Sequence, residues 1–76
     1  LNPETTISFE LVESGYMSLT IYNLLGRKVD KLVDNQFYEK GLHSVAFSGS
    51  ELASGTYIYQ LNTMNHIINK RMIILK

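Results

Sequence analysis

The stretch that decides the fold is SGTYIYQL at residues Ser54–Leu61, which is followed closely by KRMIILK at Lys70–Lys76. Side chains from Tyr57 to Leu61 alternate in the period-two pattern of a half-buried strand. Residues 62–66 carry turn chemistry, and Ile67–Leu75 continues as a second strand that ends on an apolar run. A last strand that is apolar on both faces and flanked by lysines indicates that this end of the chain is itself recognised.

The same alternation recurs along the rest of the chain and is interrupted by turn residues. The other expected strands are Thr5–Leu11, Met17–Tyr22, a shorter one at Val29–Val33, and His43–Phe47. Residues 34–41 are expected to form a connection. Together these runs predict an all-β protein, a small immunoglobulin-like antiparallel β-sandwich of about seven strands. We expect its core to include Phe9, Leu19, Ile21, Val45, Tyr57 and Met72.

Length and composition limit the possible functions. Seventy-six residues make one domain, and without cysteine neither a disulfide framework nor a thiolate metal site stabilises it. The formal net charge of zero argues against a general nucleic-acid binder. No apolar run is long enough to span a bilayer as a helix. The chain starts without a signal peptide, and we expect it to be trimmed from a longer protein.

Charge is unevenly distributed along the chain. The only charged residues before Arg27 are glutamates, whereas those after Glu51 are Lys70, Arg71 and Lys76. One interpretation is that the first and last strands lie close together and complement each other. The other is a basic patch offered to an anionic receptor or envelope component.

The order and spacing of several short motifs resemble a known family. These motifs begin with Asn2-Pro3 and the strand Thr5–Leu11, and they continue through Leu19–Asn23, Leu25-Gly26-Arg27, Val29, Leu32-Val33, Gly41-Leu42-His43, Leu52–Tyr59 and Lys70–Lys76. In this order they resemble the C-terminal sorting domain of the type IX secretion system. Val12 and Phe47 depart from the family, which commonly has proline and tryptophan there. The sandwich pattern is also similar to the immunoglobulin-like module of the flagellar hook-capping protein, a relative in fold alone.

The resemblance implies a non-catalytic cargo tag of Bacteroidota. Residues 1–76 would be a single C-terminal sorting domain, trimmed from a larger secreted protein and preceded by an N-terminal cargo domain in the same precursor. The implied partners are the outer-membrane translocon, which recognises the domain, and a sortase-like peptidase, for which the domain is a substrate. The implied route runs through the periplasm to the cell surface or the medium. The implied fold is a seven-stranded immunoglobulin-like sandwich.

The candidate recognition residues lie in the last hairpin: Gly55, Tyr57, Lys70, Arg71, Met72, Ile74, Leu75 and Lys76. Gly55 and Tyr57 also suit a tight turn and a strand, so a structural role is open for both. Lysine on an edge strand also protects against aggregation, which offers another explanation for Lys70. If the strand is recognised, addition of a strand to a sheet edge is one mechanism, with main-chain bonds giving affinity and side-chain pockets giving specificity.

Other chemistry has little support in the sequence. His43 and His66 lack metal-ligand spacing, no serine lies in a nucleophile elbow, and no cofactor motif is present. We therefore expect no enzyme, no cofactor and no metal. Two alternatives to sorting remain, a β-sandwich spacer and a carbohydrate-binding module. The second would need an exposed aromatic row drawn from Tyr16, Tyr22, Phe37, Tyr38 and Tyr59.

Overall fold

A computed structural model of the chain describes residues 4–76, so the Asn2-Pro3 motif lies outside the described part. The six strands are β1 (Glu4–Leu11), β2 (Gly15–Asn23), β3 (Lys28–Tyr38), β4 (Gly41–Ser48), β5 (Gly55–Thr63) and β6 (Ile67–Ile74). The predicted all-β class is confirmed, with six strands in residues 4–76 against the expected number of about seven. Over the same residues, no helix has the length and apolar character needed to cross a membrane.

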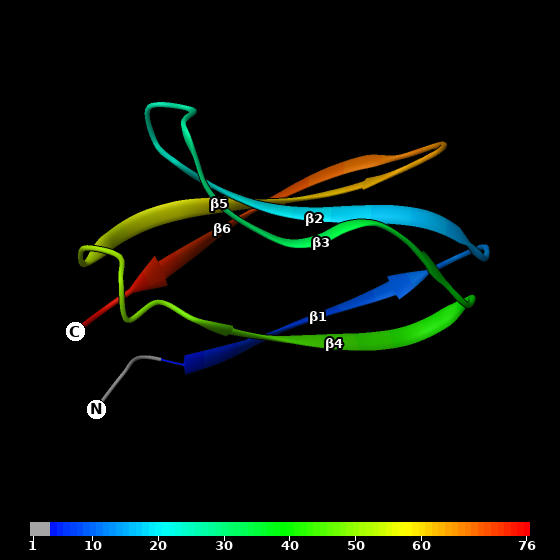
Figure 1. Cartoon of the computed structure of the whole chain (residues 1–76), viewed down its shortest axis with the longest axis horizontal. Coiled ribbons are helices and arrows are strands. Elements are labelled where there is room, and N and C mark those ends of the chain that lie inside the picture. The colour runs from blue at the N-terminus through cyan, green and yellow to red at the C-terminus, as the bar shows by residue number, and fades with distance from the viewer. Residues whose placement is uncertain (1–3) are drawn as a thin grey trace.

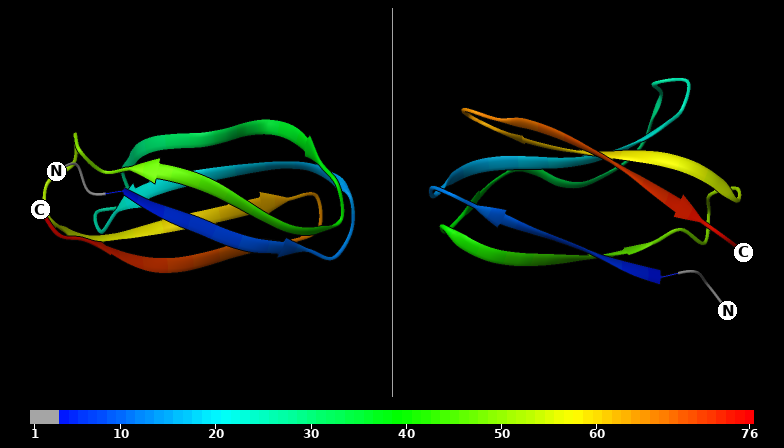
Figure 2. Two further views of the ribbon diagram at one scale, coloured as in Figure 1. Left: turned by 90° about the horizontal axis from the view of Figure 1, so that it is seen from below. Right: turned by 180° about the vertical axis from the view of Figure 1, so that it is seen from behind.

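The strands form two sheets that pack face to face as a sandwich (Figure 1). One sheet has four strands in the order β3-β2-β5-β6, and the other has two strands, β1 and β4. Every neighbouring pair is antiparallel, as the sequence predicts. The start of β1 and the end of β6 lie at the same end of the sandwich (Figure 2). In this order β3 and β6 form the two edges of the larger sheet.

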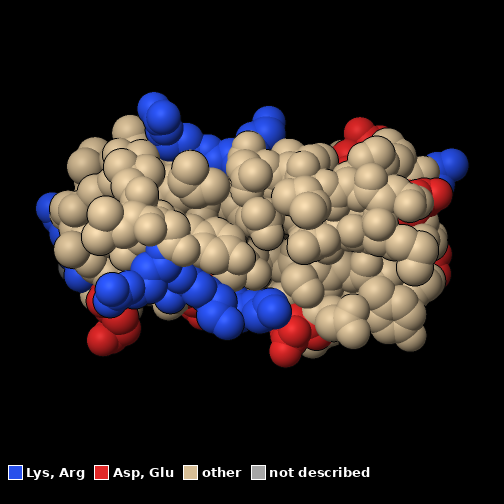
Figure 3. Space-filling model, turned by 90° about the horizontal axis from the view of Figure 1, so that it is seen from above, with Lys and Arg blue, Asp and Glu red and all other residues tan. Residues whose placement is uncertain are grey.

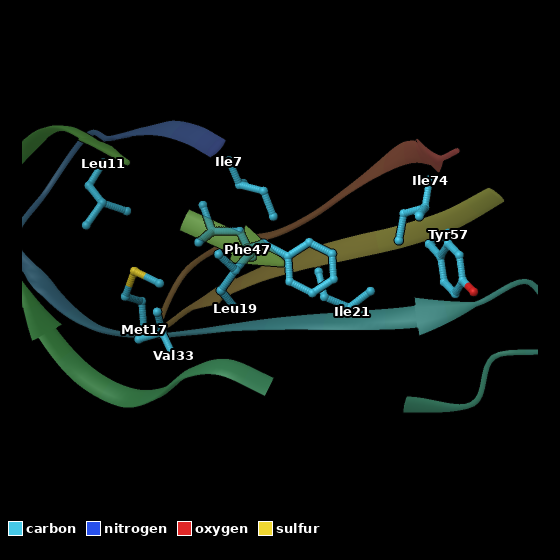
Figure 4. Close-up of a cluster of buried hydrophobic side chains, with 10 residues drawn as sticks. Ile7, Leu11, Met17, Leu19, Ile21, Val33, Phe47, Tyr57 and Ile74 are labelled. Carbon is cyan, nitrogen blue, oxygen red and sulfur yellow. The ribbon is translucent and has the colours of Figure 1, made fainter. Parts of the chain in front are cut away.

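The core lies between the sheets and is built by strand alternation. Ile7, Leu11 and Phe47 of the smaller sheet face Met17, Leu19, Ile21 and Val33 of the larger one (Figure 4). Tyr57, Leu61 and Ile74 complete this buried cluster. Leu19, Ile21 and Tyr57 are thus buried as expected. The other expected core residues pack against the cluster while partly exposed: Phe9, Val45 and Met72.

β3 departs most from the sequence prediction, which ended it at Val33 and made residues 34–41 a connection. The strand continues to Tyr38, so that prediction was wrong. The pairing of β3 with β2 shifts register at three places. At each place β3 has one residue more than β2 between the paired positions. Asn35 has a φ of 51°, and its amide donates a hydrogen bond of 3.0 Å to Ser18 Oγ. Bulges therefore absorb the turn-prone residues without ending the strand.

Candidate recognition strand

β6 is an edge strand, because within residues 4–76 it pairs with β5 along one side only. Its two faces differ in burial. Ile74 is buried and Met72 packs against the core on the inner face. Ile73 on the outer face is 65% exposed, and Leu75, just beyond the strand, is 76% exposed. The end of the strand therefore has one face anchored to the core and an exposed apolar side chain, Ile73, on the other face.

The anchored face depends on the loop between β4 and β5. Gly49 in this loop is buried, and a Cβ added to it would lie 3.0 Å from Cδ1 of Ile74. A Cβ at that distance would require the Ile74 side chain to give by a few tenths of an ångström, so glycine lets this side chain keep its place. Leu52 in the same loop packs against the core. The end of β6 is thus fitted against a specific loop.

Gly55 and Tyr57 shape the start of β5, the strand on which β6 pairs. Tyr57 is 7% exposed, and its hydroxyl donates a hydrogen bond of 2.7 Å to the carbonyl oxygen of Ala53. A strand tyrosine that bonds to the backbone a few residues upstream is the tyrosine corner of immunoglobulin-like sandwiches. Gly55 has a φ of 158° with no atom within 4 Å of an added Cβ, so its backbone conformation is what favours glycine. Both residues therefore have structural roles that support β6 indirectly.

Lys76 is held against the same β4–β5 loop. Its Nζ donates a hydrogen bond of 2.6 Å to the carbonyl oxygen of Ser50, and its backbone amide donates one of 3.0 Å to Ser54 Oγ. These two contacts fix the direction of the chain after β6. Ser50 and Ser54 were not among the sequence candidates, and no spacing or motif distinguishes them from the other serines.

The remaining basic candidates point to opposite sides of the sheet. Arg71 pairs with Ile58 on the outer face, and Lys70 pairs with Tyr59 on the inner one. Figure 3 shows the outer face, with basic and acidic side chains along its two long sides and uncharged surface between them. Lys70 and Arg71 therefore belong to opposite faces of β6.

A hollow of about 220 Å³ lies beside β1 and β6, and its lining includes Glu10 of β1 and Lys70 of β6. An acidic residue of the first strand and a basic residue of the last strand thus line the same hollow. This agrees with the first interpretation of the sequence, in which these strands lie close together. In residues 4–76, however, the one ion pair joins Lys31 and Asp34 at 3.3 Å. The acidic and basic strands share a hollow without forming a salt bridge.

The aromatic residues do not form the exposed row that a carbohydrate platform needs. Tyr16 and Phe37 are exposed and meet edge to face, with ring centroids 5.6 Å apart. The other candidates, Tyr22, Tyr38 and Tyr59, are half-buried.

The two histidines lie in the elements that the sequence predicts for them, a strand and a turn. His43 is on β4 and packs on Phe9 and Tyr38, and His66 lies in the turn before β6. No cluster of metal-ligating side chains occurs within the described residues.

Comparison with known proteins identifies the family of this chain. The family model described as "Secretion system C-terminal sorting domain" matches residues 2–75. Searches of curated proteins and of solved structures found no significant match. The match covers almost the whole chain, so the chain belongs to the family of type IX secretion C-terminal sorting domains, and the resemblance seen in its motifs is confirmed. A domain of this family is a sorting signal for the type IX secretion machinery.

Proposed function

We propose that this domain is a non-catalytic export signal and that the machinery recognises it by pairing with the edge of β6. The observation that carries the proposal is the position of β6, which is unpaired along one side within residues 4–76. Main-chain donors and acceptors on that side are available for strand addition, which supplies affinity without dependence on sequence.

Specificity in this proposal comes from the outward side chains. Ile73 and Leu75 are exposed and apolar, and Arg71 is exposed on the same outer face as Ile73. Ile73 is an addition to the sequence candidates, which included its buried neighbour Ile74. Within and beside β6 and its support, Tyr57, Met72 and Ile74 hold the strand, whereas Arg71, Ile73 and Leu75 are available to a partner.

The proposal includes the route implied by the family. The domain passes through the periplasm and is recognised by an outer-membrane translocon component, and the cargo reaches the cell surface or the medium. A sortase-like peptidase then uses the domain as its substrate. The cargo lies N-terminal to the domain in the same precursor.

A secretion assay tests the proposal in a host that has the type IX system. The chain is fused after a periplasm-targeted fluorescent protein and compared with a version that lacks Met72–Lys76. Export of the intact fusion together with periplasmic retention of the truncated one supports the proposal. Retention of both while the domain is folded contradicts it and favours a spacer.

The deletion also removes the buried Ile74, so a second variant is needed. Ile73→Asp changes an exposed side chain and leaves the core intact. Circular dichroism of each purified fusion must show a retained sheet before its export is interpreted. Normal export of a folded Ile73→Asp fusion would contradict a role for the outer face of β6.

A further inference from the structure

The hairpin between β2 and β3 presents two leucines to solvent. Leu24 is 63% exposed and Leu25 is 89% exposed, and they occupy the tip of the turn. Figure 1 shows this hairpin rising away from the sandwich, clear of the other strands. Isolated apolar side chains are common on surfaces, but two adjacent leucines on a protruding turn form a small apolar tip.

The tip is rigidly built. Asn23 Oδ1 accepts hydrogen bonds from the amides of Leu25 at 2.9 Å and Arg27 at 3.0 Å. The Gly26 amide donates to the Asn23 carbonyl oxygen at 3.0 Å, and Gly26 has a φ of 83°. This is a three-residue hairpin loop, with asparagine and glycine at the positions where the turn requires them. The turn itself makes no demand for leucine at the two tip positions, so another cause must account for them.

Basic side chains lie directly behind the tip. Arg27 and Lys28 follow it in sequence and are exposed. Cross-strand pairs also join Lys28 to Tyr22, Tyr22 to Ile58 and Ile58 to Arg71. A cation therefore lies at each edge of the outer face of the larger sheet, with two uncharged side chains between them. An apolar tip is therefore backed by cations, and a complementary surface would combine an apolar pocket with an acidic rim.

We propose that the Leu24–Leu25 tip inserts into an apolar, acid-rimmed pocket on a protein of the export machinery. This inference rests on the proposed function and adds a second contact, separate from β6. A protein pocket is favoured over a bilayer because the tip offers only two apolar side chains on a chain with zero net charge. Such a tip would anchor weakly in lipid, whereas a fixed turn suits a pocket of defined shape.

The test uses the full chain in the fluorescent fusion, comparing Leu24→Ser/Leu25→Ser with the control Leu42→Ser/Met64→Ser. The control removes two apolar side chains that are at least as exposed but lie elsewhere. We expect the exported fraction to fall about tenfold for the tip variant, as for a comparable loss of affinity, and to stay unchanged for the control. Both variants should keep the melting temperature of the parent fusion. Equal export of the tip variant and the parent would overturn the proposal while leaving the sorting function standing, whereas no export of the parent would contradict the function itself.

Two further measurements test the acidic rim of the pocket and the alternative that the tip contacts a membrane. Arg27→Glu/Lys28→Glu should reduce export severalfold, since it reverses the charge behind the tip, and unchanged export would contradict the acidic rim. Purified fusion is also floated with vesicles of anionic phospholipid. Absence from the vesicle fraction supports the protein pocket, whereas flotation that the tip substitutions abolish would overturn it in favour of a membrane contact.

Discussion

β5 and β6 belong to one hairpin, yet their side chains meet very different surroundings. β5 lies between β2 and β6, and most of its residues are buried or half-buried, whereas β6 lies at the edge and most of its residues are exposed. In sequence, both strands carry apolar residues on both faces: Tyr57, Ile58 and Tyr59 are consecutive in β5, and β6 begins and ends with a pair of isoleucines. The comparison teaches that sheet order, more than strand pattern, separates a supporting strand from a presented one.

The largest effect is expected from removing the Tyr57 side chain of β5, the strand that supports β6. Tyr57→Ala deletes a buried aromatic ring and its hydrogen bond to Ala53, and we expect a loss of about 3–5 kcal/mol of unfolding free energy. A loss of that size would leave so small a domain largely unfolded. Urea denaturation followed by circular dichroism measures it. A loss below about 1 kcal/mol would contradict the supporting role.

Neighbouring isoleucines on β6 provide the next contrast. Ile74→Ala should cost about 2–5 kcal/mol, because the side chain is buried and fitted against Gly49. Ile73→Ala, on the exposed face, should stay within about 0.5 kcal/mol of the parent. Chemical denaturation of both variants gives the difference directly, and similar losses for the two would show that the faces are not distinct.

A milder substitution measures the contribution of the hydrogen bond in the tyrosine corner. Tyr57→Phe keeps the ring in the core but removes the hydroxyl that donates to the Ala53 carbonyl oxygen. We expect a loss of about 1 kcal/mol, as for one partly buried hydrogen bond. Thermal unfolding by calorimetry measures it, with Tyr16→Phe as the control at an exposed tyrosine. Equal melting temperatures for Tyr57→Phe and Tyr16→Phe would contradict a stabilising role for this hydrogen bond.

The smallest effect is expected at the end of the strand. Ser54→Ala removes the acceptor for the Lys76 amide while leaving the core untouched. Global stability should change by less than about 0.5 kcal/mol, but the Lys76 amide should exchange its hydrogen about tenfold faster. Hydrogen exchange followed by NMR measures both quantities. Unchanged exchange at Lys76 would mean that Ser54 does not hold this end of the chain.

Much of the fold could be predicted from local patterns. The alternation in β1, β2, β4 and β5 reports one buried face each, and this is why Leu19, Ile21 and Tyr57 were assigned to the core correctly. The length of β3 could not be predicted, because Asp34-Asn35 are turn-forming residues in isolation. The shift in register opposite Ser18 and the hydrogen bond from the Asn35 amide to Ser18 Oγ show that they form a bulge instead.

The candidate site was predicted only in outline. The sequence placed most of the candidate residues on the last strand, and the structure shows that Ile74 lies on its buried face and Ile73 on its exposed face. It could not show that Lys76 reaches Ser50, because that contact joins segments far apart in the chain and follows from packing. The exposure of the tip leucines could not be predicted either, since it depends on how the hairpin projects from the sheet.

The central claim is that the exposed face of β6 is recognised, whereas β5 serves to hold it. The most direct test compares the export of two fluorescent fusions, Ile73→Ser/Leu75→Ser and Tyr57→Phe, beside the parent. The account predicts that the first loses about tenfold in export at an unchanged melting temperature, and that the second keeps its export despite a lower one. Full export of the first fusion, or loss of export in the second while it remains folded, would contradict the claim.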